Sequence, residues 1–155
     1  MVYNRKQHIE RSFGKNCESY HRQATLQKNI AQNLAEFLPK KDNIKILEIG
    51  CGTGFLTEKL NQLYPKSQFV ISDVSYDMIA FCRQRFIGYN NMNFQTLDGD
   101  HINLDTEFDL IVSSMCVQWF QNPLDSFETL KKYLRPGGNI VYSVPGPKCF
   151  QEWEG

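Results

Sequence analysis

The chain lacks an excess of charge of either sign and has no long apolar run. Lysine plus arginine and aspartate plus glutamate each total 17 of its 155 residues. This balance creates no overall field that would attract nucleic acid or an anionic membrane. The amino terminus is polar and has no apolar stretch typical of a secretory signal. We therefore expect no nucleic acid and no membrane as partners, but a small molecule or a locally complementary protein.

Paired cysteines and clustered histidines are also missing. The five cysteines lie far apart with no C-x-x-C pair, which favours a reducing compartment and predicts a cytoplasmic location. The three histidines, His8, His21 and His101, form no evident catalytic triad or metal set, so we expect no metal. His8 is interpreted as exposed, whereas for His21 the choice between helix surface and a cofactor-facing role stays open.

The apolar pattern predicts a single α/β domain over 1–155. Hydrophobic residues make up 41% of the chain, which is enough for one compact core. The periodicity predicts an amino-terminal helical segment over 1–39, with a helix over 18–38, and a cofactor-binding core over 44–144. In this core we expect strands over 44–49, 68–72, 91–97, 108–113 and 139–144, and helices after Gly54, over 75–86 and over 123–134. Because strands and helices alternate, we predict a parallel sheet with helices on both faces and a ligand crevice at the carboxyl ends of the strands.

The most informative segment is ILEIGCGTG, over residues 46–54. A β-branched strand ends there in a turn with Gly50, Gly52 and Gly54 at alternate positions, and helical spacing follows. Glycines permit backbone conformations that side chains forbid, and they let a ligand approach the main chain. Glu48 would repel a pyrophosphate but attract a cofactor that carries a ribose and a cationic amino acid. The segment therefore favours S-adenosylmethionine over NAD, and a purely structural turn is the alternative.

A second acidic residue, Asp73, follows the strand predicted over 68–72. It lies about 20 residues beyond the glycine turn, which is the spacing of nucleotide-binding βαβ units. A carboxylate there could accept hydrogen bonds from both hydroxyls of a ribose. In the alternative interpretation Asp73 only helps to cap the helix that begins near Ser75, because Asp and Ser are both favoured at that position. The coincidence of the two motifs favours a cofactor site.

The order of these motifs resembles that of class I S-adenosylmethionine-dependent methyltransferases. The resemblance rests on ILEIGCGTG, Asp73, LDGD over 97–100, FDLIVSS over 108–114 and LRPGG over 134–138. Three further segments resemble the malonyl-[acyl-carrier protein] O-methyltransferases of biotin synthesis: SFGKNCESYHRQATLQ over 12–27, QWF over 118–120 and YSVPGPKCFQEW over 142–153. The resemblance implies a Rossmann-like class I methyltransferase fold with S-adenosyl-L-methionine as cofactor. It also implies methylation of the free carboxylate of a malonyl thioester on acyl carrier protein.

The resemblance further implies roles for individual residues. At the methionine and ribose end of the cofactor it implies Glu48, Gly50, Cys51, Gly52 and Gly54, with Asp73 on the ribose hydroxyls. Around the adenine it implies Val74, Met78, Asp100 and the main chain of His101. Beside the transferred methyl it implies Ser113 and Ser114, over the cofactor it implies Tyr20, and in the acceptor pocket it implies Trp119. Asp98 competes with Asp100 for its role, and Tyr20 and Trp119 have core packing as their alternative.

The proposed chemistry needs few groups. A carboxylate acceptor is already ionised at neutral pH, so no general base is expected, and positioning with exclusion of water suffices. Cys51 has no evident histidine partner, which argues against a nucleophile. An acidic carrier protein would require a local basic patch, for which Lys15, Arg22 and Lys148 are the candidates, with ordinary solvated charges as the alternative.

The length of the chain departs from the family pattern. Class I methyltransferases usually add another helix and an antiparallel pair of strands, whereas this sequence ends at Gly155. We therefore expect a C-terminally truncated domain with an exposed strand edge that a homodimer could cover. The alternatives to a carrier-protein methyltransferase are a methyltransferase for another small molecule and a non-catalytic cofactor-binding remnant. A dehydrogenase comes third, because Glu48 and the glycine spacing disfavour it.

Overall fold

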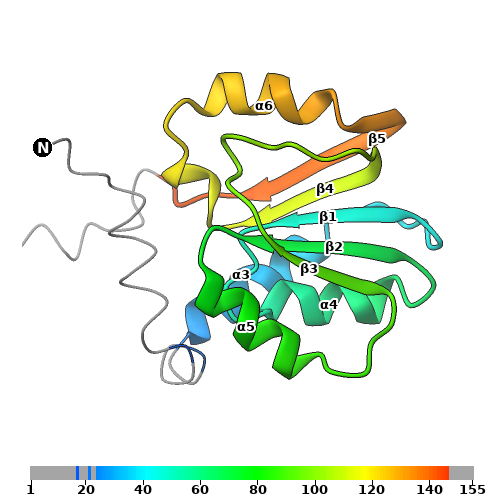
Figure 1. Ribbon diagram of the computed structural model, residues 1–155, viewed down its shortest axis with the longest axis vertical. Helices are drawn as coiled ribbons and strands as arrows, with labels where there is room; N and C mark the ends of the chain where they lie inside the picture. Colours follow the sequence, from blue (N-terminus) through cyan, green and yellow to red (C-terminus); the bar gives the residue numbers. More distant parts are fainter. Residues whose placement is uncertain (1–16, 18–20, 22–23, 147–155) are drawn as a thin grey trace, which may run out of the picture.

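The computed structural model describes residues 17, 21 and 24–146 (Figure 1). Its elements, in chain order, are α3 (Thr25–Ala35), β1 (Lys45–Ile49), α4 (Phe55–Leu63), β2 (Gln68–Asp73), α5 (Tyr76–Arg85), β3 (Met92–Thr96), β4 (Phe108–Ser114), the 3-10 helix η1 (Val117–Trp119), α6 (Pro123–Lys131) and β5 (Leu134–Ser143). The alternation of strands and helices that the apolar pattern predicts is confirmed.

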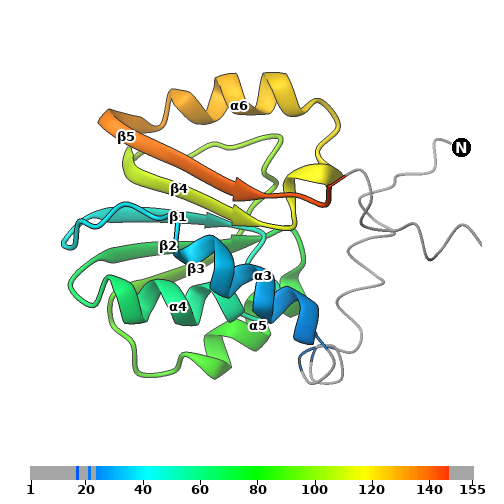
Figure 2. The same ribbon diagram turned by 180° about the vertical axis from the view of Figure 1, so that it is seen from behind.

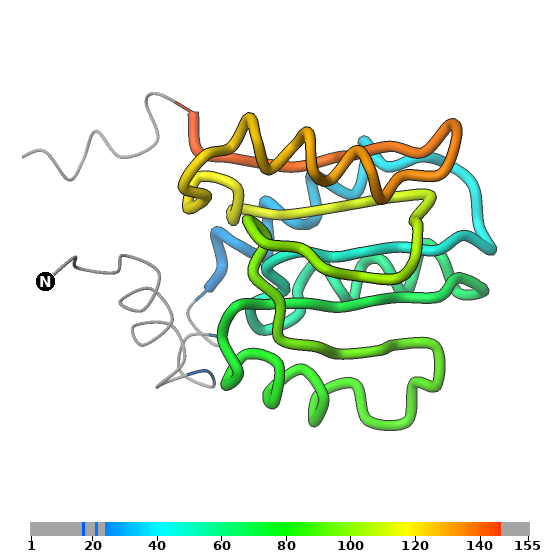
Figure 3. The backbone as a smooth tube through the Cα atoms, turned by 45° about the horizontal axis from the view of Figure 1, so that its top comes forward, coloured from blue at the N-terminus to red at the C-terminus, as the bar shows by residue number. Residues whose placement is uncertain are grey.

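The strands form one parallel sheet in the order β3-β2-β1-β4-β5. β1 lies at its centre, in register with β2 from Lys45↔Gln68 to Ile49↔Ser72. In Figure 3, β5 and α6 lie at one side of the sheet, and β3 and α5 lie at the other. Within the described part of the chain β5 pairs only with β4, so the exposed strand edge expected from the sequence lies along β5.

Two apolar clusters cover the two faces of the sheet. Ile46 and Leu47 are neighbours in β1 and therefore point to opposite faces. Ile46 packs with residues of α3, α4 and α5, including Leu34 and Leu60. Leu47 packs with Leu130 of α6 and with the segment between β3 and β4. Figure 2 shows α6 across the sheet from α3 and α4, as expected for a parallel sheet that is buried on both faces.

Element ends differ from the predicted bounds for local reasons. α6 ends at Lys131, not at residue 134, because Leu134 already pairs with Phe108 of β4. The register is irregular between Phe108 and Leu110, so β5 begins earlier than predicted and runs regularly from Asn139. Of the predicted helix over 18–38, α3 covers Thr25–Ala35, and residues 17 and 21 are also helical. The remaining residues before 24 lie outside the described part.

Helix starts bring polar main chain to the carboxyl end of the sheet. α4 follows Gly54, whose φ of 89° places it in the left-handed region. α5 begins after Ser75, whose Oγ accepts the N–H of Met78 at 3.4 Å as an N-cap. α6 begins after Asn122 with Pro123 in its first turn. The helices α4 and α5, which follow β1 and β2, thus begin at the same edge of the sheet.

Candidate cofactor site

A pocket lies at the carboxyl ends of β1, β2 and β4, the edge predicted for the ligand crevice. The structure brings most of the predicted site residues together in its lining: Glu48, Gly50, Cys51, Gly52, Asp73, Val74, Met78, Ser114 and Trp119. Gly54, Asp100, His101 and Ser113 are not among the lining residues, and Tyr20 lies outside the described residues.

The glycine loop forms the floor of this pocket. Gly50 and Gly52 have φ values of 73° and 54°, conformations that side chains rarely adopt. A Cβ on Gly50 would lie 2.5 Å from Sγ of Cys116, so no side chain fits there. A Cβ on Gly52 would meet no atom within 4 Å, which leaves its main chain open to a ligand. Gly54 instead faces Phe86, the C-cap residue of α5, because its Cβ would lie 2.6 Å from that ring.

Asp73 connects the glycine loop to the start of α5. Its Oδ2 accepts the N–H of Gly52 at 2.9 Å, and its Oδ1 accepts the N–H of Ser75 at 2.9 Å. The side-chain cap of α5 is Ser75 itself, so capping of this helix does not depend on Asp73 alone. The carboxylate is 9% exposed and lines the pocket.

Glu48 is a buried carboxyl group beneath the loop. It is 1% exposed, and the hydroxyl of Thr57 donates to its Oε2 at 2.6 Å. Burial raises the pKa of Glu48 to about 8, and the negative charge of Asp73 adds to the rise, whereas the Thr57 hydrogen bond and the charge of Arg85 oppose it. Glu48 is therefore mostly protonated at neutral pH, and a cation in the pocket would favour its ionised form.

Asp98 and Asp100 lie on one loop but have different surroundings. Asp98 lines the pocket, whereas Asp100 accepts the N–H of Gln121 at 3.0 Å and the hydroxyl of Ser126 at 2.6 Å. Asp100 thus holds the start of α6. His101 points its Nδ1 to Asp98 at 3.1 Å. Of the two competing carboxylates, the placement favours Asp98 as the group beside a ligand, and the adenine role of Asp100 stays a prediction.

The end of β4 forms the opposite wall. Ser114 lines the pocket and its hydroxyl lies 3.2 Å from that of Ser143 on β5. Ser113 is buried and donates to the carbonyl of Ile49 at 2.8 Å, so it ties β4 to β1. Met115 follows with a φ of 54°, a strained value for a side chain with Cβ, and the chain then turns into η1. This turn brings Trp119 over the pocket.

His21 contacts the glycine loop from the amino-terminal side. Its Nδ1 lies 2.9 Å from Oγ1 of Thr53, and its ring stacks on Phe55 with centroids 4.5 Å apart. Thr53 and Phe55 both line the pocket, so His21 supports its rim. Burial lowers the pKa of His21, and the charge of Arg85 lowers it further. The basic-patch candidates Lys15, Arg22 and Lys148 lie outside the described residues.

Several lining residues were missed by the sequence reasoning. Gln27 and Ala31 reach the pocket from α3, and their spacing of four residues, which places both on one helix face, was the available signal. Cys116 and Phe120 line the pocket on either side of the predicted Trp119. Cys116 lies against Gly50 and Phe120 lies against Gly99, and the sequence holds no local signal for such long-range contacts.

Cys51 is unsuited to act as a nucleophile, and the described residues form no metal centre in this pocket. Sγ of Cys51 lies 3.7 Å from that of Cys82, and this contact together with burial raises the pKa of the Cys51 thiol well above its usual range. No group of three or more His, Cys, Asp or Glu side chains is placed to hold a metal in the part that the structure describes. None of the described helices has the length and apolarity needed to cross a membrane.

Comparisons with known proteins agree with this geometry. Residues 47–140 match the family described as "Methyltransferase domain". A malonyl-[acyl-carrier protein] O-methyltransferase of Magnetococcus marinus is 35% identical over 98% of this chain, and one of Bacillus cereus is 33% identical over 93%. The chain spans 57% and 55% of the length of these two relatives. The crystal structure of an S-adenosylmethionine-dependent methyltransferase from Mesorhizobium loti is similar with a TM-score of 0.70 and 26% identity, over 78% of this chain and 56% of that one.

Proposed function

The chain belongs to the family of methyltransferase domains, and we propose that it binds S-adenosylmethionine and methylates a malonyl carboxylate. The acceptor is a malonyl thioester carried by acyl carrier protein, and the reaction serves biotin synthesis. The malonyl-[acyl-carrier protein] O-methyltransferases of Magnetococcus marinus and Bacillus cereus support this acceptor, since their similarity extends over nearly the whole chain. The free thiols of Cys51 and Cys82 fit the reducing cytoplasm as the place of action.

The observation that carries the proposal is the pairing of Gly52 with Asp73 at the floor of the pocket. One side of the loop offers glycine main chain with no atom in front of it, and Asp73 offers a carboxylate beside it. A ribose presents two hydroxyl donors, which such a carboxylate accepts. Glu48 lies under the same loop and suits a cationic group, because a neighbouring positive charge would favour its ionised form at neutral pH. The residues present therefore fit S-adenosylmethionine.

S-adenosylmethionine supplies an electrophilic methyl group on a sulfonium. The residues of the chain would bind and orient this cofactor: Asp73 would hold the ribose, and Val74 and Met78 would border the adenine. Ser114 and Trp119, which also line the pocket, would face the acceptor. An anionic acceptor needs no proton removed, so this reaction requires no general base. Exclusion of water and alignment of the acceptor supply the rate enhancement.

Two experiments test this function in order. Calorimetric titration with S-adenosylmethionine and with NAD separates a methyltransferase site from a dehydrogenase site, and only the first is expected to bind. A carboxyl-methylation assay with malonyl carrier protein then separates an active enzyme from a cofactor-binding remnant. Free malonyl thioesters in the same assay distinguish a carrier-protein acceptor from another small molecule. Binding of NAD without binding of S-adenosylmethionine would overturn the proposal.

Substitutions in the candidate basic patch of Lys15, Arg22 and Lys148 test whether the acceptor is bound to a carrier protein. Charge reversal at Lys15 and Arg22 together should slow methylation of malonyl carrier protein, with a smaller effect at high salt. Affinity for S-adenosylmethionine should not change. Equal rates for the variant and the parent at low salt, in an active preparation, would favour a free small-molecule acceptor.

A further inference from the structure

The outer side of the glycine loop is held by one face of α5. The thiol of Cys82 donates to the carbonyl of Gly52 at 3.2 Å, and Nη1 of Arg85 donates to the carbonyl of Thr53 at 2.7 Å. The next residue, Gly54, packs against the ring of Phe86. Cys82, Arg85 and Phe86, the residue that caps α5, follow the three- and four-residue spacing of a single helix face. None of them is among the residues that line the pocket.

Arg85 is held in one orientation by contacts on several sides. Its Nη2 forms an ion pair with Oε2 of Glu58 on α4 at 3.0 Å, while Nη1 reaches Thr53. Its guanidinium lies 5.6 Å from the ring centroid of Phe55 and 5.0 Å from that of Phe86. The side chain is 20% exposed. A planar fork that serves a carbonyl and a carboxylate together suits arginine, because an ammonium cannot span both acceptors in this way.

The loop is therefore held from two sides. The N–H of Gly52 donates to Asp73 on the pocket side, and the carbonyls of Gly52 and Thr53 accept from α5 on the outer side. Within the loop a turn bond from the N–H of Gly54 to the carbonyl of Cys51 adds support. Residues with positive φ have alternative backbone states close in energy, so an unsupported loop would sample other shapes.

We propose that Arg85 is a positioning residue for the cofactor, which fixes the main chain of the glycine loop from outside the pocket. This inference rests on the proposed function, because the ligand that the loop would hold is S-adenosylmethionine. Without Arg85 the carbonyl of Thr53 loses its charged donor and Glu58 loses its partner. The loop then has to be ordered when the cofactor binds, and that ordering weakens the affinity.

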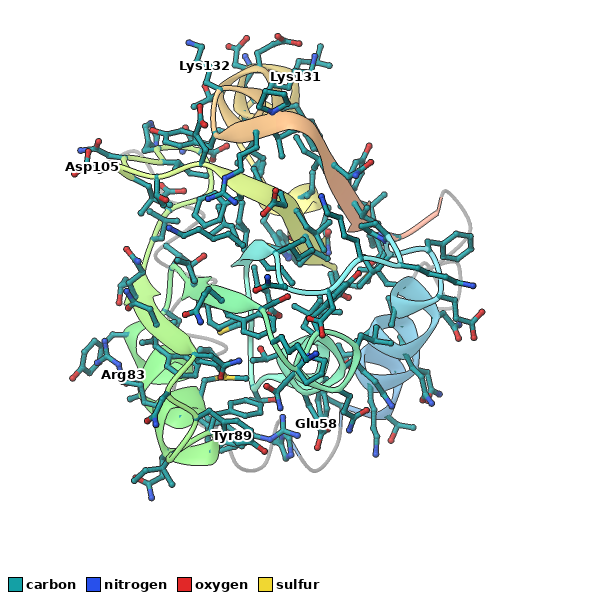
Figure 4. The ribbon with its side chains drawn as sticks, turned by 90° about the vertical axis from the view of Figure 1, so that its right-hand side faces the viewer. Glu58, Arg83, Tyr89, Asp105, Lys131 and Lys132 are labelled. Atoms are coloured by element: carbon teal, nitrogen blue, oxygen red, sulfur yellow. The ribbon has the colours of Figure 1, made fainter. Side chains whose placement is uncertain are left out.

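Arg83 offers a matched control on the same helix. Its Nη2 donates to the carbonyl of Phe94 on β3 at 2.8 Å, so Arg83 and Arg85 each give a charged hydrogen bond to a main-chain carbonyl. In Figure 4, Arg83 lies on the outer side of α5, apart from the labelled Glu58. Its acceptor is not part of the glycine loop. Replacing either arginine therefore removes a hydrogen bond from α5 to a main-chain carbonyl, but only replacement of Arg85 removes one from the glycine loop.

The test compares Arg85→Ala, Arg85→Lys and Arg83→Ala with the parent by calorimetric titration with S-adenosylmethionine. We expect Arg85→Ala to weaken binding by about tenfold or more, the loss of a charge-assisted hydrogen bond, and Arg83→Ala to stay within about twofold. Arg85→Lys should fall between them. Melting temperatures without ligand report any general loss of stability. Equal affinities for Arg85→Ala and Arg83→Ala would overturn the proposal.

Hydrogen exchange of the unliganded proteins separates this inference from the proposed function. Amides of residues 50–56 should exchange faster in Arg85→Ala than in the parent, with no change in Arg83→Ala. If the parent does not bind S-adenosylmethionine, the proposed function fails, and the exchange result alone then decides whether Arg85 fixes the loop. Unchanged exchange in Arg85→Ala would overturn the inference in either case.

Discussion

Replacing Glu48 by glutamine is expected to stabilise the unliganded protein and to weaken its binding of S-adenosylmethionine. Glutamine imitates the protonated carboxyl group, because its side-chain oxygen can still accept the hydroxyl of Thr57. It cannot ionise, however, so it offers no charge to a cationic cofactor. The native Glu48 would therefore reduce the stability of the free protein but support cofactor binding in the complex.

The pKa of Glu48 gives the size and sign of the stability effect. Its ordinary value is 4.5, and burial raises it to about 8 in the folded protein. An acid whose pKa is raised in the folded protein contributes to the free energy of unfolding fully below pH 4.5. This contribution is lost as the pH rises towards 8. At about 1.4 kcal/mol for each pH unit, the loss at pH 7 is on the order of 3 kcal/mol. The variant should match the parent at pH 4 and exceed it increasingly up to pH 8.

Binding of a cation should reverse this balance. A sulfonium or ammonium near Glu48 favours the carboxylate, so the parent should release up to about one proton on binding between pH 6 and 7. Its affinity should rise by up to about tenfold for each pH unit in that window, where the α-amino group of the cofactor stays charged. The variant should show neither the proton release nor the pH dependence.

Denaturant unfolding at pH 4, 7 and 8 measures the stability difference, and titration calorimetry in two buffers of unlike ionisation enthalpy counts the protons. Glu128→Gln serves as the control, because Glu128 is 70% exposed on α6 and should change neither quantity. A Glu48→Gln protein that is less stable than the parent at pH 8 would refute the raised pKa. Equal proton release from both proteins would refute the placement of the cationic group beside Glu48.

Three further changes test the pocket and its rim. Asp73→Ala should weaken S-adenosylmethionine binding by about a hundredfold, as measured by calorimetry. The two ribose hydroxyls would lose a charged acceptor, and the N–H of Gly52 would lose its partner. An unchanged affinity would contradict the ribose assignment. Gly52→Val should abolish binding with a modest loss of melting temperature, whereas Gly88→Val, with the same open space and a φ of 94°, should lose stability and keep binding. His21 has a lowered pKa, so its contribution to stability is present above pH 6.5 and lost as the pH falls through this ordinary value. The melting temperature should therefore fall more steeply between pH 7 and 5 for the parent than for His21→Gln, and equal slopes would contradict the lowered pKa of this partly buried ring.

Local signals predict the strands of the sheet and the shape of the loop. The β-branched run before Gly50 and the switch to helical spacing after Gly54 predict β1, the turn and α4 in this order, and the structure confirms them. The prediction that Asp73 belongs to the site depends only on its position at the end of the next strand. Such features depend on side-chain period and on glycine conformations, both of which are written in neighbouring residues.

Long-range contacts decide the remaining details of the site. Asp98 and Asp100 are equivalent as sequence, and only the start of α6, where Gln121 and Ser126 engage Asp100, separates them. Gly54 is equivalent to Gly52 in the motif, yet α5 packs against it and turns it away from the pocket.

The sequence by itself determined that a parallel α/β domain presents a glycine loop and an acidic residue at one edge, because hydrophobic period, glycine content and motif spacing are local properties. Only the tertiary structure decided that Arg85 supports that loop, that Glu48 is buried deeply enough to hold a proton at neutral pH, and that Ser113 ties strands together. These roles depend on which residues distant in sequence become neighbours in space. Such neighbours are set by the packing of α5 and the strands against each other, and burial, on which the shifted pKa depends, arises only when that packing is complete.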